Sequence, residues 1–135
     1  MRRRSFLVAG PILAAVILIW AACSSGQGTP APTRGLSQEE SQRIAQQYVI
    51  DDETFQFDGL DETLNLTGTE TLRCPYCWAF TFEFQSRHSG FGNRTGQVLL
   101  QVITPHTARV VIESGGVTSA VMDGKWDMMT EKSIE

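Results

Sequence analysis

The sequence predicts an α+β domain of two layers, in which one N-terminal helix packs on an antiparallel sheet of about four to five strands. Three observations support this. A helix-capping pattern opens the domain, apolar residues then alternate with period two in short runs, and turns rich in glycine and proline separate those runs. Short turns can join antiparallel strands, whereas parallel strands need a long crossover, so we expect an antiparallel sheet.

The helix is expected to begin after Ser37 and to end near Ile50. Ser37 and Glu40 have the spacing of a capping box, in which each side chain bonds the backbone N–H of the other residue. The apolar residues that follow recur at helical spacing on one face, and they are Ile44, Ala45, Tyr48 and Val49. A helix of this length is marginal alone, so this face must pack on the sheet.

The strongest strand signal is the alternation of Trp78, Phe80, Phe82 and Phe84, whose aromatic face is the expected partner of the helix. Weaker or shorter period-two runs predict further strands at residues 55–57, 64–66, 97–103, 108–113 and 117–122. Breaks between strands are expected at residues 104–106, at residues 114–116 and at residues 123–124.

Residues 1–22 have the features of a signal peptide of the lipoprotein type. Three arginines precede an apolar run of 17 residues, which is shorter than the roughly 20 that span a bilayer. The stretch Ile19-Trp20-Ala21-Ala22-Cys23 resembles a prokaryotic lipobox, with Trp20 where that motif usually has leucine. The resemblance implies diacylation of Cys23 and a lipid-anchored location on the extracytoplasmic side of the cell membrane. An ordinary signal peptide or an uncleaved anchor stays as an alternative, and residues 3–7 also resemble a twin-arginine export motif.

The remaining chain divides into a flexible tether (residues 23–36), a domain (residues 37–127) and a C-terminal tail (residues 128–135). The tether is rich in Ser, Gly, Pro and Thr and has no hydrophobic periodicity. Without residues 1–22 the chain keeps 8 basic and 15 acidic residues, a net charge of −7. A chain this acidic, without a basic stripe, is not expected to bind nucleic acid.

The motif Cys74-Pro75-Tyr76-Cys77 allows three interpretations. The favoured one is a structural disulfide between Cys74 and Cys77 across a tight turn, since thiols outside the cytoplasm tend to be oxidised. The second is a thiol–disulfide redox site, because this tetrapeptide is also the active-site motif of glutaredoxins. That chemistry needs a helix N-terminus at the first cysteine, whereas the residues after Cys77 have the period of a strand. The third is a metal site that adds His88 and His106, although their spacing matches no common zinc signature.

The order of elements, ending in a hairpin whose turn is Glu113-Ser114-Gly115-Gly116-Val117, resembles PepSY-like domains. A cystatin-like domain has a similar order. PepSY-like domains are small extracytoplasmic modules thought to bind or inhibit peptidases, so the resemblance implies a binding module.

The sequence contains no complete catalytic set, and we expect no cofactor and no metal. The hypothesis is therefore a non-enzymatic, membrane-anchored binding or regulatory domain with a protein or peptide partner. Its contact surface is expected on the loop of residues 86–95, through Arg87, His88, an exposed Phe91 and Arg94, together with any uncovered face of the sheet. The alternative is a redox or metal-binding protein that uses the two clustered cysteines.

Overall fold

The computed structural model describes residues 35–135. The predicted signal peptide, the lipidation site Cys23 and the tether up to residue 34 lie outside the described residues. Among residues 35–135, no helix is long and apolar enough to cross a membrane.

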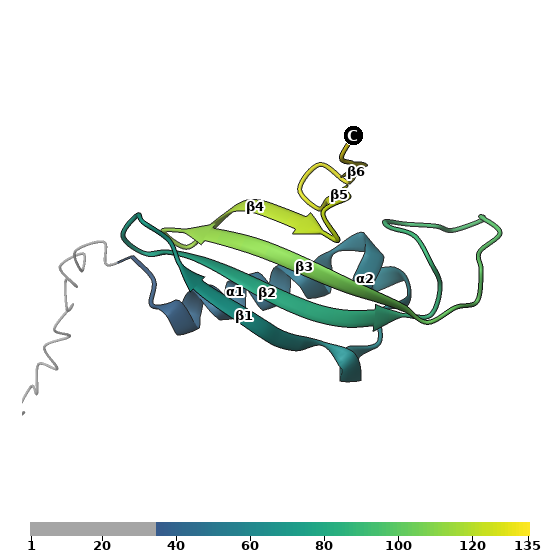
Figure 1. The fold of residues 1–135 in the computed structure, drawn as a ribbon, viewed down its shortest axis with the longest axis horizontal. Coiled ribbons are helices and arrows are strands. Elements are labelled where there is room, and N and C mark those ends of the chain that lie inside the picture. Colours follow the sequence, from purple (N-terminus) through teal and green to yellow (C-terminus); the bar gives the residue numbers. More distant parts are fainter. Residues whose placement is uncertain (1–34) are drawn as a thin grey trace, which may run out of the picture. The chain divides into compact units, whose positions relative to one another are not determined.

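Helix α1 (Gln38–Asp51) begins where the capping box predicts. The Ser37 hydroxyl accepts a hydrogen bond from the Glu40 backbone N–H at 3.2 Å, and the Glu40 carboxylate accepts one from the Ser37 backbone N–H at 2.8 Å. The Glu40 carboxylate accepts hydrogen bonds from both the backbone N–H and the hydroxyl of Ser37, and these lower the pKa of Glu40 from its ordinary value of 4.5. Ala45 and Val49 are fully buried on the inner face of the helix, which covers the sheet in Figure 1.

The prediction of a strand at residues 55–57 is wrong, because they lie in the short helix α2 (Glu53–Asp58). Asp52 caps this helix by accepting a hydrogen bond from the Thr54 backbone N–H at 2.8 Å. Phe55 then turns into the core. Three alternating residues contain too little of either period to separate a strand from a helix, whereas Asp52 is a helix-start signal in the sequence.

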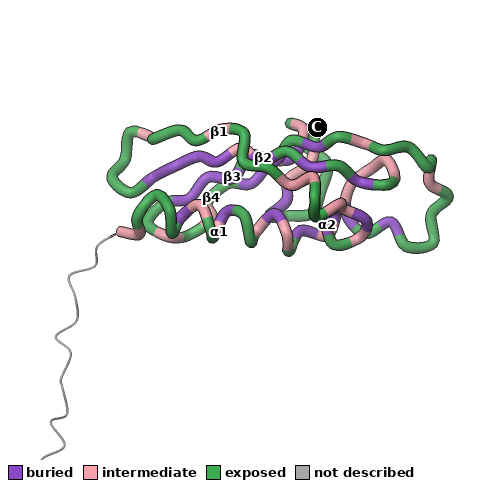
Figure 2. Tube along the Cα trace, turned by 90° about the horizontal axis from the view of Figure 1, so that it is seen from below, coloured by how far each residue is buried: buried purple, intermediate pink, exposed green. Residues whose placement is uncertain are grey.

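The sheet is a single antiparallel meander in the order β1-β2-β3-β4-β5-β6. A 3-10 turn, η1 (Asp61–Thr63), leads into the strands, which are β1 (Asn65–Thr71), β2 (Cys77–Ser86), β3 (Thr104–Glu113), β4 (Gly116–Met122), β5 (Trp126–Asp127) and β6 (Lys132–Ser133). The α+β prediction is confirmed in architecture. The predicted number of about four to five strands is too low, because two strands of two residues each extend the sheet beyond Met122 to six strands. Figure 2 shows the helical layer along one face, with buried segments between the two layers.

The aromatic face of β2 forms the centre of the core, as predicted. Trp78, Phe80, Phe82 and Phe84 are each at most 9% exposed, and they pack with the inner face of α1 and with alternate residues of β3 and β4. Residues on the other side of β2 alternate with them, and Glu83 among these is exposed. Burial of several large aromatic side chains supplies much of the apolar area that stabilises a domain of this size.

Two predictions around β3 are wrong. Residues 97–103 form no strand, and residues 104–106 begin β3 instead of interrupting the sheet. All ten residues of β2 pair with β3, from Cys77 opposite Glu113 to Ser86 opposite Thr104, and β1 occupies the other edge of β2. No edge of β2 is therefore free for residues 97–103. Pro105 is tolerated because β4 joins β3 only from Ala108 onward, so at Pro105 the strand is an edge.

Candidate functional site

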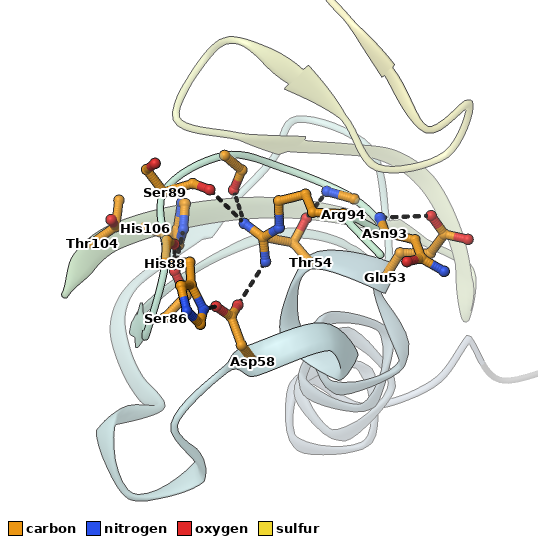
Figure 3. A network of polar contacts seen from close by, with 12 residues as sticks. Glu53, Thr54, Asp58, Ser86, His88, Ser89, Asn93, Arg94, Thr104 and His106 are labelled. Atoms are coloured by element: carbon orange, nitrogen blue, oxygen red, sulfur yellow. Dashed lines mark hydrogen bonds and ion pairs between the residues drawn. The ribbon is translucent and has the colours of Figure 1, made fainter. Parts of the chain in front are cut away.

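A network of polar side chains lies at the end of the sheet where β2 leads into β3. We call it the polar network, and its members are Asp58, Ser86, His88, Arg94, His106 and Asp123. They come from α2, β2, β3, the β2–β3 connection and the turn after β4, so distant parts of the sequence meet here. Figure 3 shows much of this network, together with contacts from Glu53 and Thr54. Buried polar groups must find partners, so such a network fixes the segments that carry it.

On β3, His106 lies at the centre of one half of the network. Its Nδ1 is 2.7 Å from Asp123 Oδ2, and its Nε2 is 3.1 Å from Ser86 Oγ. Asp123 Oδ1 also accepts a hydrogen bond from the Thr107 backbone N–H at 2.7 Å. The His106 ring is 2% exposed and packs beside Phe84, with ring centroids 5.1 Å apart. His106 is therefore a buried strand residue, whereas the break predicted at residues 104–106 would have left it in a turn.

The other half of the network centres on Asp58, the last residue of α2. Its Oδ1 lies 2.6 Å from Arg94 Nη2, and its Oδ2 lies 2.7 Å from His88 Nδ1. Arg94 is 2% exposed, donates to the backbone carbonyls of Ser89 and Gly90, and lies 4.7 Å above the Phe57 ring. Asp58 is 8% exposed, and its two cationic or hydrogen-bonding partners compensate for the burial of its carboxylate.

Further contacts hold the β2–β3 connection to the helical layer between these two halves. The Gly92 backbone N–H donates to Thr54 Oγ1 at 2.8 Å, and the Asn93 backbone N–H donates to Glu53 Oε2 at 3.1 Å. Phe91 stacks on Trp126 with ring centroids 5.7 Å apart. Residues 88–94 are thus a packed and hydrogen-bonded part of the fold.

The order Asp123–His106–Ser86 matches the carboxylate, imidazole and hydroxyl of a serine hydrolase, but the hydrogen bonds run against that chemistry. Ser86 is fully buried, and its hydroxyl donates its single hydrogen to the His88 carbonyl oxygen at 2.6 Å. Ser86 Oγ must then accept from His106 Nε2, whereas a nucleophile would donate to it. The arrangement holds β2, β3 and the connection together rather than activating an alcohol.

The exposed part of the site is a stretch of the β2–β3 connection, and members of the polar network fix the chain before and after it. We call residues 97–103 the apolar segment, and they lie between the buried residues Arg94 and His106. Four large apolar side chains in it are exposed, with relative exposures of 104% for Val98, 73% for Leu100, 54% for Val102 and 55% for Ile103. The full connection runs from residue 87 to residue 103, and connections longer than about 12–15 residues without strand or helix are usually either functional loops or linkers. This combination of fixed ends and exposed apolar side chains is typical of a contact element.

Of the four residues that the sequence suggested for the contact surface, two are at least partly accessible and two are packed into the fold. Arg87 is exposed and His88 is partly exposed. Phe91 is half-buried against Trp126, so the expectation of an exposed Phe91 is wrong. Arg94 is buried in its ion pair with Asp58 and presents no surface to a partner. Sequence analysis missed the apolar segment as an exposed element, although one signal was present: no Asp, Glu, Lys or Arg occurs between Arg94 and Arg109.

The Cys74-Pro75-Tyr76-Cys77 motif forms the turn between β1 and β2. The Cys74 and Cys77 sulfurs are within disulfide-bonding distance, with Cα atoms 5.5 Å apart. Cys77 is the first residue of β2, so the premise that an extended strand follows it is confirmed. The helix N-terminus that lowers the pKa of a redox-active thiol is not found at this turn.

The four residues considered for a metal site do not meet. Cys77 starts β2, whereas His106 pairs with Phe84, seven residues farther along the same strand, a separation of about 23 Å at 3.3 Å per residue. Within residues 35–135, no group of three or more His, Cys, Asp or Glu side chains is placed to hold a metal ion.

The sheet face away from α1 contains a hollow of about 620 Å³. It is lined by Thr81, Thr107, Arg109, Ser119, Val121, Asp123 and Gly124. Arg109 forms an exposed ion pair with Glu70 at 2.8 Å, so its charge has a partner at the rim. The lining combines three hydroxyl side chains with the Arg109 guanidinium and the Asp123 carboxylate. This face is an uncovered sheet surface of the kind expected to make contacts.

No protein-family model, curated protein or solved structure matches this chain.

Proposed function

We propose that this chain is an extracytoplasmic lipoprotein, anchored to the cell membrane through Cys23, and that its domain is a non-enzymatic binding module. The single observation that carries the binding role is the apolar segment, which exposes four large apolar side chains between two buried polar anchors. Burying those side chains against a partner would remove apolar area from water, a favourable contribution of about 25 cal/mol for each Å² that is opposed by the entropy cost of association.

The apolar segment and the start of the described chain lie at opposite ends of the sheet. Gly35 lies against Tyr76 in the β1–β2 turn, and Leu36 lies against Gly115 in the β3–β4 turn. The apolar segment joins β2 to β3 at the other end of the sheet, as Figure 1 shows. The apolar segment therefore lies at the end of the sheet opposite Gly35, the first residue that the structure describes.

The partner is proposed to be a protein. The resemblance to PepSY-like domains makes an extracytoplasmic peptidase one class of partner to test. The excess of acidic residues in the mature chain argues against nucleic acid and against the surface of anionic lipids.

The binding role is tested by the reactivity of Leu100→Cys toward a membrane-impermeant maleimide, in membranes of the producing cell and after purification in detergent. We expect slow labelling in membranes and fast labelling of the purified chain, because the partner covers the segment only in the membrane. Thr118→Cys, at an exposed position of β4, is the matched control and should label equally fast in both samples. Equal labelling of Leu100→Cys in both samples contradicts a partner at this segment.

The anchor is tested separately with Cys23→Ala. The unsubstituted chain should remain with the membrane fraction after a high-salt wash, and its mature N-terminus should carry the mass of a diacylglycerol. The Cys23→Ala chain should lack that mass, since the modification needs the thiol. An unmodified Cys23 in the mature chain contradicts lipid anchoring.

A further inference from the structure

The apolar segment has the sequence of a strand but lacks the partner strand that would complete it. We infer that this partner is the apolar segment of a second copy of this chain, and that two copies pair as an antiparallel ribbon with Leu100 opposite Leu100 of the second copy. The inference rests on the proposed function, because it names the partner of the same contact element.

The side-chain pattern of the segment is complementary to itself. In an extended chain Val98, Leu100 and Val102 lie on one face, and all three are more than half exposed. Residues 97–103 have Leu100 at their centre, so a two-fold axis there places Val98 of each copy opposite Val102 of the other. Directly opposite residues share a face of an antiparallel pair, and this register therefore gives one face made only of valine and leucine.

The backbone of the segment also has the capacity to pair. Among the described residues, its main-chain hydrogen bonds are Gln97 N–H to the Arg94 carbonyl at 3.1 Å and Val102 N–H to the Leu100 carbonyl at 3.0 Å. The N–H groups from Val98 to Gln101 make no main-chain hydrogen bond within residues 35–135. A second strand would accept hydrogen bonds from every second N–H of the segment, which is the basis of recognition by strand addition. The bond from Val102 to Leu100 closes a tight turn at Gln101, and this turn must open when the segment pairs.

Charge favours a second copy over an oppositely charged partner. The chain has no Asp, Glu, Lys or Arg between Arg94 and Arg109, so two apolar segments meet without repulsion. The rest of the mature chain is acidic, and exposed like charges repel over a Debye length of about 8 Å. Pairing through a neutral element that projects from the end of the sheet keeps the two acidic bodies apart.

The buried residues at the two ends of the connection hold the apolar segment in one orientation. Arg94 and His106, at the two ends of the connection, are buried. Arg94 is ion-paired with Asp58 and His106 is hydrogen-bonded to Asp123, so the segment is presented at a fixed place on the domain. Two segments of seven residues bury less area than the roughly 1,200–2,000 Å² of a stable interface. Confinement of both copies to one membrane raises their effective concentration and offsets this small area.

The test is disulfide cross-linking of the full chain in membranes of the producing cell. Opposed residues in an antiparallel pair have Cα atoms about 4.5–5.5 Å apart, which is within disulfide range. Under mild oxidation, Leu100→Cys should form a covalent dimer several-fold faster than Gln101→Cys, because Gln101 lies opposite Leu99 in this register. The unsubstituted chain gives the background from its own cysteines, and Thr118→Cys reports random collision.

A second set of variants checks the register. Cells that co-express Val98→Cys and Val102→Cys chains should yield a mixed dimer, and adding Leu100→Asp to both chains should abolish it by placing two carboxylates opposite each other. Absence of a Leu100→Cys dimer, or equal rates for Leu100→Cys and Gln101→Cys, overturns the inference. If Leu100→Cys is shielded from maleimide in membranes but does not cross-link to itself, the binding function stands and self-pairing fails.

Discussion

Two stretches of this chain carry large apolar side chains at every second position, and they lie in opposite environments. In β2, Trp78 to Phe84 are buried between α1 and the neighbouring strands. In the apolar segment, Val98, Leu100 and Val102 face solvent. The difference teaches that a period-two pattern specifies which face of a strand is apolar. A strand forms, however, only where a neighbouring strand is available to pair with it. β2 has β1 and β3 on its two edges, and the apolar segment has neither.

The largest expected difference between the two stretches is in stability. Phe82→Ala should lower the free energy of unfolding by about 4 kcal/mol, because it leaves a cavity in the core. Leu100→Ala should change it by less than about 0.5 kcal/mol, since the side chain is already in water. Urea unfolding of each full-length variant measures both values. A loss of several kcal/mol for Leu100→Ala would show that the segment packs within its own chain.

The contrast also explains what could be predicted from the sequence. The capped helix, the β2 strand and the last hairpin were predictable, because each has a local pattern and packs against its neighbours along the chain. The exposed state of residues 97–103 could not be predicted, because their pattern is that of a strand. Only the fold shows that β2 pairs along its whole length with residues 104–113 and leaves residues 97–103 outside the sheet.

The buried positions of Asp58, His106 and Arg94 could not be predicted for a related reason. Each of these residues follows or precedes a turn signal, and polar residues near turns are usually solvated. Their partners lie between 17 and 36 positions away along the chain, so no local pattern connects them. Only the arrangement of α2 beside the end of the sheet brings these groups together.

The ion pair between Arg94 and Asp58, which fixes one end of the apolar segment, can be removed without a substitution in the segment itself. Arg94→Met should lower the free energy of unfolding by about 3 kcal/mol, because Asp58 loses its buried cationic partner. Arg87→Met is the matched control, since Arg87 is exposed in the same connection, and it should change stability by less than about 0.5 kcal/mol. Equal effects of the two substitutions in urea unfolding would argue against a structural role for the ion pair.

A smaller effect is expected at the opposite end of the sheet. Cys77→Ser should lower the free energy of unfolding by about 2 kcal/mol, the chain-entropy value for so short a disulfide loop. Cys74→Ser should cost about the same, because both substitutions remove one cross-link. Neither should alter the shielding of Leu100→Cys in membranes. Loss of that shielding at unchanged stability would favour the redox hypothesis for this motif.

The smallest expected effect concerns the cap of α2. Burial raises the pKa of Asp52 from its ordinary value of 3.8, with hydrogen bonds to Thr54 opposing the shift. The folded protein therefore binds this proton more tightly than the unfolded chain does. The charged carboxylate costs stability at neutral pH, and the cost disappears as pH falls through the raised pKa toward the unfolded value.

Asp52→Asn should consequently raise the melting temperature slightly at pH 7, because asparagine is also a good N-cap and carries no charge to bury. The gain should shrink as pH approaches 4. Asp61→Asn, at an exposed position, is the control and should have little effect at pH 7. A lower melting temperature for Asp52→Asn at pH 7 would show that the charge itself stabilises the helix start.

The central claim is that the apolar segment is unpaired in a single copy of the chain, and amide hydrogen exchange tests it most directly. In dilute, purified full-length protein, residues 80–84 should exchange only through global unfolding, whereas residues 98–101 should exchange at nearly the rate of an unfolded peptide. Protection of residues 98–101 comparable to that of residues 80–84 in the same sample would contradict the account.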